Sequence, residues 1–164
     1  MRENSPHESE RLNAYFDLIR ATDGKATNQE LEKAVRKAET IFVQKIGDRS
    51  EKKFMEFAKR IGDIKSVFKP SCEDDVFNGI DMWLKFNDTL GLPNLPVQVK
   101  SSDRDVNMFK TKRHYIKHAG MEIVINCGPT VSLKMFRNQL TKEVSRIKNA
   151  LISNPELYKN LPKR

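Results

Sequence analysis

The spacing of apolar residues changes part-way along this 164-residue chain. Before Gly62, apolar residues recur every three or four positions, as on one face of a helix, whereas several later segments alternate apolar and polar residues, as in a strand. Helical patterns return between and after these strand segments. This order favours a mixed α/β (α+β) fold in which helices flank a central sheet, and the chain length suits one domain.

Capping and stop signals predict three helices in the first third of the chain. Capping boxes at residues 5–8 and 27–30 open the first two helices, and Gly47 is the expected end of the second. Ser50 is the expected N-cap of a third helix that ends at Gly62. The first helix is thus an extra N-terminal element, and the next two lead into the first strand.

Strand patterns occupy four short segments of the remaining chain. They are residues 64–69, 79–86, 97–101 and 121–126. Within the second segment, Asp81 and Trp83 share the face opposite the apolar one, and Trp83 is expected to cover core beneath a helix.

Two further helices and a tail complete the expected elements. Ser102 caps a helix over residues 104–120, and a longer helix covers residues 131–152. The residues after Asn154 include two prolines and are expected to form a loose tail.

The balance of charge points to a polyanionic partner. The chain has 30 Lys and Arg against 22 Asp and Glu, a formal net charge of +8, so nucleic acid is the first partner to consider. No apolar stretch approaches the roughly 20 residues that cross a bilayer, and the polar start lacks a secretion signal. We therefore expect no membrane contact and a cytoplasmic location. Cys72 and Cys127 form no CxxC pair and are expected to be reduced structural thiols.

Three residues on neighbouring strand segments form the most informative motif. Gln98 and Lys100 are two positions apart and leave the same face of their strand, and pairing across the loop at residues 87–96 brings Asp81 to that face. A carboxylate and an amide oxygen suit Mg²⁺, which keeps several waters and takes one or two protein carboxylates. Lys100 could then act on the attacking water or on the phosphate.

A solvated polar face is the alternative interpretation of the same triplet. Triplets of an acid or Gln, any residue and Lys also occur at residues 51–53 and 63–65, because the chain is rich in lysine. The first lies in a predicted helix, and the second has no strand led by Asp before it. Only the triplet ending at Lys100 has the required strand context.

These residues resemble the PD-(D/E)XK nucleases, which have the restriction endonuclease-like fold. The resemblance covers residues 28–128, with Asp81 opening one strand and Gln98-Val99-Lys100 on the next. Ile80 stands where the motif has Pro, and Gln98 stands where it usually has an acid, as in QxK branches that include homing and repair-type nucleases. The resemblance implies a nuclease-like domain at residues 28–153 between an N-terminal extension, 1–27, and a flexible tail, 154–164.

The resemblance also implies an acid on the helix before the strands. Helical geometry nominates Glu39, which lies at the edge of the apolar stripe, as a third metal ligand beside Asp81 and Gln98. Glu32 has a similar angle but lies nearer the helix start. Asp74 and Asp75 are alternatives on the loop before the strand.

Basic residues on two helices are the candidate nucleic-acid contacts. They are Arg104, Lys110, Lys112, Arg113, Lys117, Lys134 and Arg137. His114 and His118 have the i, i+4 spacing of zinc ligands, but the surrounding cations favour a basic helix face instead. The charges of the last helix are equally explained as an ordinary solvated surface.

The predicted function is a DNA endonuclease that uses Mg²⁺, or Mn²⁺ in its place, to hydrolyse phosphodiester bonds of duplex or branched DNA. RNA remains open as a substrate, and a homodimer is expected because a duplex offers two backbones related by a two-fold axis. A binding module of the same fold with a weakened metal site is the main alternative, and a scaffold for a protein partner is the third.

Overall fold

The computed structural model describes residues 6–70 and 79–161, apart from the side chains of Pro6, His7, His114, Lys117 and Asn160. Two compact units divide the chain, Met1–Asp48 and Arg49–Arg164. Within the described residues, no helix is long and apolar enough to cross a bilayer. The boundary between the units falls inside a helix, at a different place from the predicted boundary at residues 27 and 28.

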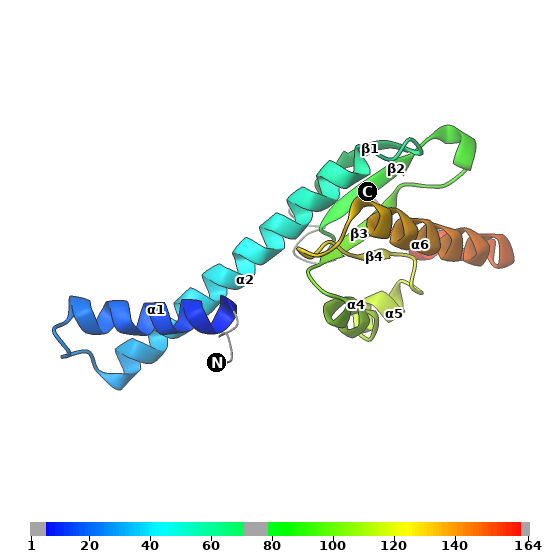
Figure 1. The fold of residues 1–164 in the computed structure, drawn as a ribbon. Coiled ribbons are helices and arrows are strands. Elements are labelled where there is room, and N and C mark those ends of the chain that lie inside the picture. The colour runs from blue at the N-terminus through cyan, green and yellow to red at the C-terminus, as the bar shows by residue number, and fades with distance from the viewer. Residues whose placement is uncertain (1–5, 71–78, 162–164) are drawn as a thin grey trace. The chain divides into compact units, whose positions relative to one another are not determined.

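The first unit is a helical hairpin. Helix α1, Pro6–Ala21, leads through a turn in which Gly24 has a φ of +74°, a conformation that favours glycine. The chain then folds back as the first part of helix α2, Asn28–Ala58 (Figure 1). The predicted capping box is confirmed, because Glu30 accepts from the Thr27 amide and the Thr27 hydroxyl accepts from the Glu30 amide.

The prediction of two separate helices between residues 28 and 62 is wrong. Helix α2 runs without a break through Gly47 and Ser50. Gly47 does not have the positive φ of a helix stop, and a Cβ at this position would meet no atom within 4 Å. Gly47 therefore costs only the roughly 1 kcal/mol of a glycine in a helix interior. Ser50 is buried within the helix rather than capping one.

A four-stranded mixed sheet forms the centre of the second unit (Figure 1). Its strands are β1, Ile64–Phe68; β2, Met82–Phe86; β3, Leu95–Lys100; and β4, Ile123–Asn126. They lie in the order β1-β2-β3-β4, with the first two pairs antiparallel and the third pair parallel. The predicted mixed sheet flanked by helices is therefore confirmed, whereas the finer restriction endonuclease-like fold stays a prediction.

The remaining helices belong to the same unit. They are the 3-10 helix η1, Asp88–Leu90; α4, Asp103–Lys110; α5, Arg113–Lys117; α6, Leu133–Ser153; and the 3-10 helix η2, Pro155–Asn160. The predicted cap at Ser102 is confirmed, but the single helix expected over residues 104–120 is two, because the chain breaks near Thr111. Residues expected to form a loose tail instead continue as η2, where Leu157 packs against the core.

Strand alternation separates an apolar face of the sheet from a polar one. The apolar face packs against the end of α2 and against α6. The sheet contributes Met82, Leu84, Val97, Val99, Ile123 and Ile125, and the helices contribute Phe54, Phe136, Leu140 and Ile147. Gln98, Lys100 and Asn126 leave the other face, which α4 covers in part. Trp83 also lies on that face and is 1% exposed, which confirms that it covers core.

A close backbone approach holds the end of β3 beside the end of β4. The amide of Cys127 donates to the Lys100 carbonyl at 2.8 Å, and a Cβ at Gly128 would lie 2.1 Å from the Ser101 carbonyl oxygen. Only glycine fits at residue 128. Burial raises the pKa of the Cys127 thiol to about 12, so this thiol stays protonated and has no nucleophilic role at neutral pH. Cys72 lies outside the described residues.

Candidate functional site

Asp81, Gln98 and Lys100 meet on the polar face of the sheet. Met82, the first residue of β2, pairs with Val97, and the amide of Asp81, the residue just before β2, donates to the Val97 carbonyl at 3.0 Å, so Asp81 lies beside β3. Because side chains two apart share a face, Lys100 joins them from the next position along β3. The predicted pairing of the two strands is confirmed for β2 and β3, and Asp81 immediately precedes the paired residues.

The Lys100 ammonium connects the three side chains. Its Nζ donates to Gln98 Oε1 at 2.6 Å and lies 3.7 Å from Asp81 Oδ2. Asp81 Oδ2 also accepts from the Val99 amide at 2.6 Å, so its carboxylate is fixed to the backbone of the strand that carries the other two residues. The three polar groups thus have set positions before any ligand binds.

These side chains differ in their access to solvent. Asp81 and Lys100 are about one-fifth exposed, with side-chain exposures of 20% and 23%, whereas Gln98 is 2% exposed. Gln98 Nε2 is buried and has no hydrogen-bond partner within residues 6–70 and 79–161. Its oxygen end faces the lysine, as expected for an amide beside an ammonium group. Solvent and small ligands therefore reach the site through Asp81 and Lys100.

An aromatic ring of α4 completes the surroundings of Lys100. The Lys100 ammonium lies 4.8 Å from the ring centroid of Phe109, which is 3% exposed. Lys112 lies over the same ring at 5.7 Å, and Tyr115 packs edge-on against it. Phe109 lies within the helix expected over residues 104–120, but nothing in the spacing shows that this helix covers Lys100.

The oxygen donors of this site fit Mg²⁺ held largely by water and substrate. Asp81 supplies one carboxylate, and Gln98 Oε1 supplies a neutral oxygen on the same face. Among the described residues there is no group of three or more His, Cys, Asp or Glu side chains that could enclose a metal. Magnesium commonly binds one or two protein carboxylates and keeps several waters, so Asp81 and Gln98 are of the right chemical type, and the Mg²⁺ site itself stays a prediction.

The predicted helix acid, Glu39, lies in the first unit. Its carboxylate pairs with Arg11 of α1 at 3.0 Å, so its part in the metal site stays a prediction. Asp74 and Asp75 lie outside the described residues.

Glu51 is an acid of α2 that was not predicted as a site residue. It belongs to the second unit and pairs with Lys69 at 2.8 Å. Lys69 follows Phe68, which pairs with Trp83, so Glu51 contacts the end of the sheet where Asp81 lies. Its spacing of three from buried Phe54 is the signal that could have indicated an inward-facing acid.

Most of the predicted nucleic-acid contacts are exposed. The exposed ones are Arg104, Lys112, Arg113, Lys134 and Arg137. Lys110 instead lies 2.8 Å from the buried Glu143 carboxylate, and the Lys117 side chain is not described. The surface of α4 and α6 can therefore present positive charge, although Lys110 is already committed to an ion pair.

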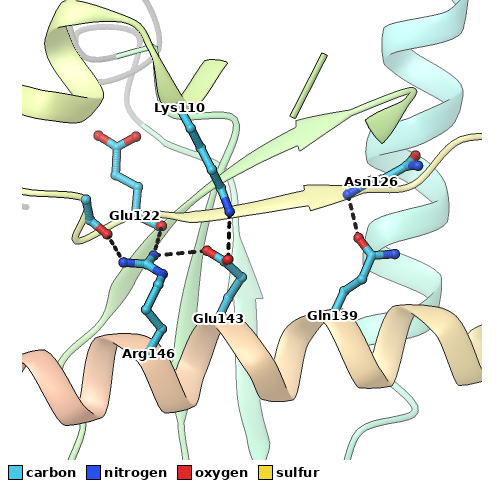
Figure 2. A network of polar contacts seen from close by, with 7 residues as sticks. Lys110, Glu122, Asn126, Gln139, Glu143 and Arg146 are labelled. Atoms are coloured by element: carbon cyan, nitrogen blue, oxygen red, sulfur yellow. Dashed lines mark hydrogen bonds and ion pairs between the residues drawn. The ribbon is translucent and has the colours of Figure 1, made fainter. Parts of the chain in front are cut away.

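A buried polar network joins α4, α6 and the start of β4 (Figure 2). Glu143 accepts from Lys110 at 2.8 Å and from Arg146 at 2.9 Å, and Arg146 also donates to the carbonyls of Gly120 and Glu122. Burial acts to raise the pKa of Glu143, but hydrogen bonds and charges from Lys110 and Arg146 outweigh it and lower the pKa. The network fixes the helix that carries Phe109 relative to the sheet edge.

Three further contacts hold the elements around the site. The Asn126 amide donates to Gln139 of α6 (Figure 2), and its side chain donates to Asp103 at the start of α4. His118 Nδ1 lies 2.5 Å from the wholly buried Glu122 carboxylate. His118 thus has an acid partner, and the His114 side chain is not described, so the nature of the histidine pair stays a prediction.

Comparison with protein-family models, with curated proteins and with solved structures finds no match to this chain. The resemblance to PD-(D/E)XK nucleases therefore rests on the motif and the element order. The predicted homodimer likewise stays a prediction.

Proposed function

We propose that the chain is a metal-dependent nuclease that hydrolyses phosphodiester bonds in DNA. The observation that carries this proposal is the meeting of Asp81, Gln98 and Lys100 on one face of two paired strands, with the lysine 2.6 Å from the amide and 3.7 Å from the carboxylate. The carboxylate and the amide oxygen are suited to bind a metal ion, and the ammonium beside them is suited to bind a phosphate.

Asp81 and Gln98 Oε1 would hold Mg²⁺, with Glu51, which pairs with Lys69, as a candidate for a second acid. The metal, when bound, polarises the phosphate and makes a bound water more acidic. Asp81 is already oriented by the Val99 amide, so little reorganisation is needed to present its carboxylate. Lys100 places a positive charge where negative charge builds on the scissile phosphate.

The exposed basic residues supply the surface for the rest of the DNA. Lys112 shares the Phe109 ring with Lys100, so a phosphate contact just after α4 would adjoin the proposed catalytic lysine. A net charge of +8 adds long-range attraction to a polyanion. The backbone of the substrate would therefore follow α4 toward Asp81.

The proposal predicts DNA binding that weakens with salt and cleavage that requires a divalent cation. The logarithm of the binding constant falls with the logarithm of salt concentration by about 0.9 for each duplex phosphate contacted. Filter binding at several salt concentrations measures this slope, and nicking of plasmid and branched DNA with Mg²⁺, Mn²⁺ or a chelator measures cleavage. Binding that ignores salt, or no cleavage of any substrate with either metal, contradicts the proposal.

A non-catalytic nucleic-acid-binding module is the second candidate function. It is favoured by Gln98, whose neutral amide stands where the motif usually has an acid, so that Asp81 is the sole carboxylate in direct contact with Lys100 among the described residues. Salt-sensitive binding without metal-dependent cleavage, across duplex, branched and single-stranded DNA and RNA, selects this function.

A further inference from the structure

Lys100 is surrounded chiefly by groups that attract a cation without neutralising it. Its hydrogen-bond acceptor is the neutral amide of Gln98 at 2.6 Å, and the nearest carboxylate oxygen, on Asp81, lies at 3.7 Å, beyond an ordinary hydrogen bond. The Phe109 ring centroid lies at 4.8 Å, within the range of a cation–π contact. The Lys100 ammonium is therefore held by a neutral hydrogen bond and an aromatic ring, with Asp81 as its ion-pair partner.

The Phe109 ring is itself held from several sides. It is 3% exposed, it packs against Tyr115 with centroids 6.0 Å apart, and the helix that carries it is capped at Ser102. Lys110, the next residue, is tied to Glu143 on α6. A ring fixed in this way can fix the flexible four-carbon chain of a lysine that rests on it.

We propose that Phe109 is a positioning residue for the nuclease reaction, which places the Lys100 ammonium for contact with the scissile phosphate. This inference rests on the proposed nuclease function. Gln98 fixes the direction of the ammonium through a hydrogen bond, and Phe109 supports it from α4 without adding a negative charge. Loss of the ring leaves Lys100 in place in the sequence but free to adopt other rotamers, so catalysis falls more than DNA binding does.

Phe109→Met tests this role, because methionine keeps most of the apolar volume and removes the ring. Since cation–π contacts contribute about 0.5–2 kcal/mol, we expect kcat for DNA cleavage to fall roughly 2- to 30-fold while the Kd for DNA stays within about twofold. Phe109→Tyr keeps the ring and is expected to retain most of the activity.

Phe57→Met is the matched control. Phe57 also lies beneath a lysine, Lys53, but Lys53 donates to the Gly128 and Pro129 carbonyls rather than to the Asp81 site. This variant loses a phenyl ring and a cation–π contact of the same kind, but at a distance from the Asp81 site in the contact network. Its kcat is expected to stay near that of the unmodified protein. An equal fall in kcat for Phe57→Met and Phe109→Met overturns the positioning role.

NMR of the Lys100 side chain separates this inference from the function on which it rests. A ring beneath the ammonium shifts the neighbouring Lys100 methylene protons upfield, and we expect that shift in the unmodified protein and its loss in Phe109→Met. If the unmodified protein cuts no DNA, the proposed function fails while the shift still reports the contact. If DNA is cut but the shift is absent, or if Phe109→Met leaves kcat unchanged, the inference is overturned.

Discussion

Asp81→Asn and Lys100→Met will each lower the rate of DNA cleavage by about 100-fold or more, while changing DNA affinity far less. Asparagine keeps an oxygen for the Val99 amide but loses the charge that attracts a metal. Methionine keeps an unbranched chain over Phe109 but removes the ammonium that lies 2.6 Å from Gln98 Oε1. Initial rates of plasmid nicking and DNA binding, measured for the same preparations, separate the two effects.

Asp63→Asn and Lys85→Met are the matched controls for these variants. Both residues are exposed in the second unit, and no described interaction joins them to Asp81 or Lys100. Their substitutions change the net charge by the same amounts as Asp81→Asn and Lys100→Met. They are expected to cleave DNA at nearly the unmodified rate. If a control variant loses as much activity as the site variant with which it is matched, the effect comes from the total charge and not from the site.

Glu143→Ala is expected to destabilise the protein by about 3 kcal/mol, near the lower end of the range for breaking a buried ion pair. The Glu143 side chain is 8% exposed, and its removal leaves Lys110 and Arg146 facing each other without their shared acid. About a third of each cation remains exposed to water, which moderates the cost. Chemical unfolding measures the loss, with Glu32→Ala as a control because Glu32 belongs to an exposed pair with Arg36.

The contribution of Glu143 also depends on pH in a stated direction. Lys110 and Arg146 overcome the effect of burial and hold the pKa of Glu143 below its usual 4.5. A carboxyl whose pKa is lower in the folded protein than in the unfolded chain stabilises the fold at pH values above its unfolded pKa. This stabilisation is lost as the pH falls through the folded pKa. The difference in unfolding free energy between the unmodified protein and Glu143→Gln should therefore shrink below pH 4.5. A difference that grows on acidification contradicts the network as described.

The site residues on the strands could be predicted because strand geometry constrains them closely. Alternation alone puts Gln98 and Lys100 on one face, and a short connection to the strand before them brings Asp81 beside β3. Capping chemistry likewise predicted the turns at Thr27 and Ser102. These signals are local, so they do not depend on how distant segments pack.

The missed features depend on contacts between distant segments. Gly47 and Ser50 have the composition of a helix boundary, but the packing of Phe54 and Ala58 against the sheet favours a continuous α2. Phe109 meets Lys100, and Glu51 meets Lys69, only after α4 and α2 have packed on the sheet. Glu39 was predicted from its angle around the helix axis. That angle shows how close a residue lies to the apolar stripe, but not to which unit the residue belongs.

The central claim is that Asp81 and Gln98 bind a divalent metal beside Lys100. The most direct measurement adds small amounts of Mn²⁺ to isotope-labelled protein and records by NMR which resonances broaden first. The account predicts that the backbone amide of Val99 and the side-chain amide of Gln98 broaden first, and that Asp81→Asn abolishes this effect. Broadening that starts at residues away from these strands, or that is unchanged in Asp81→Asn, would contradict the claim.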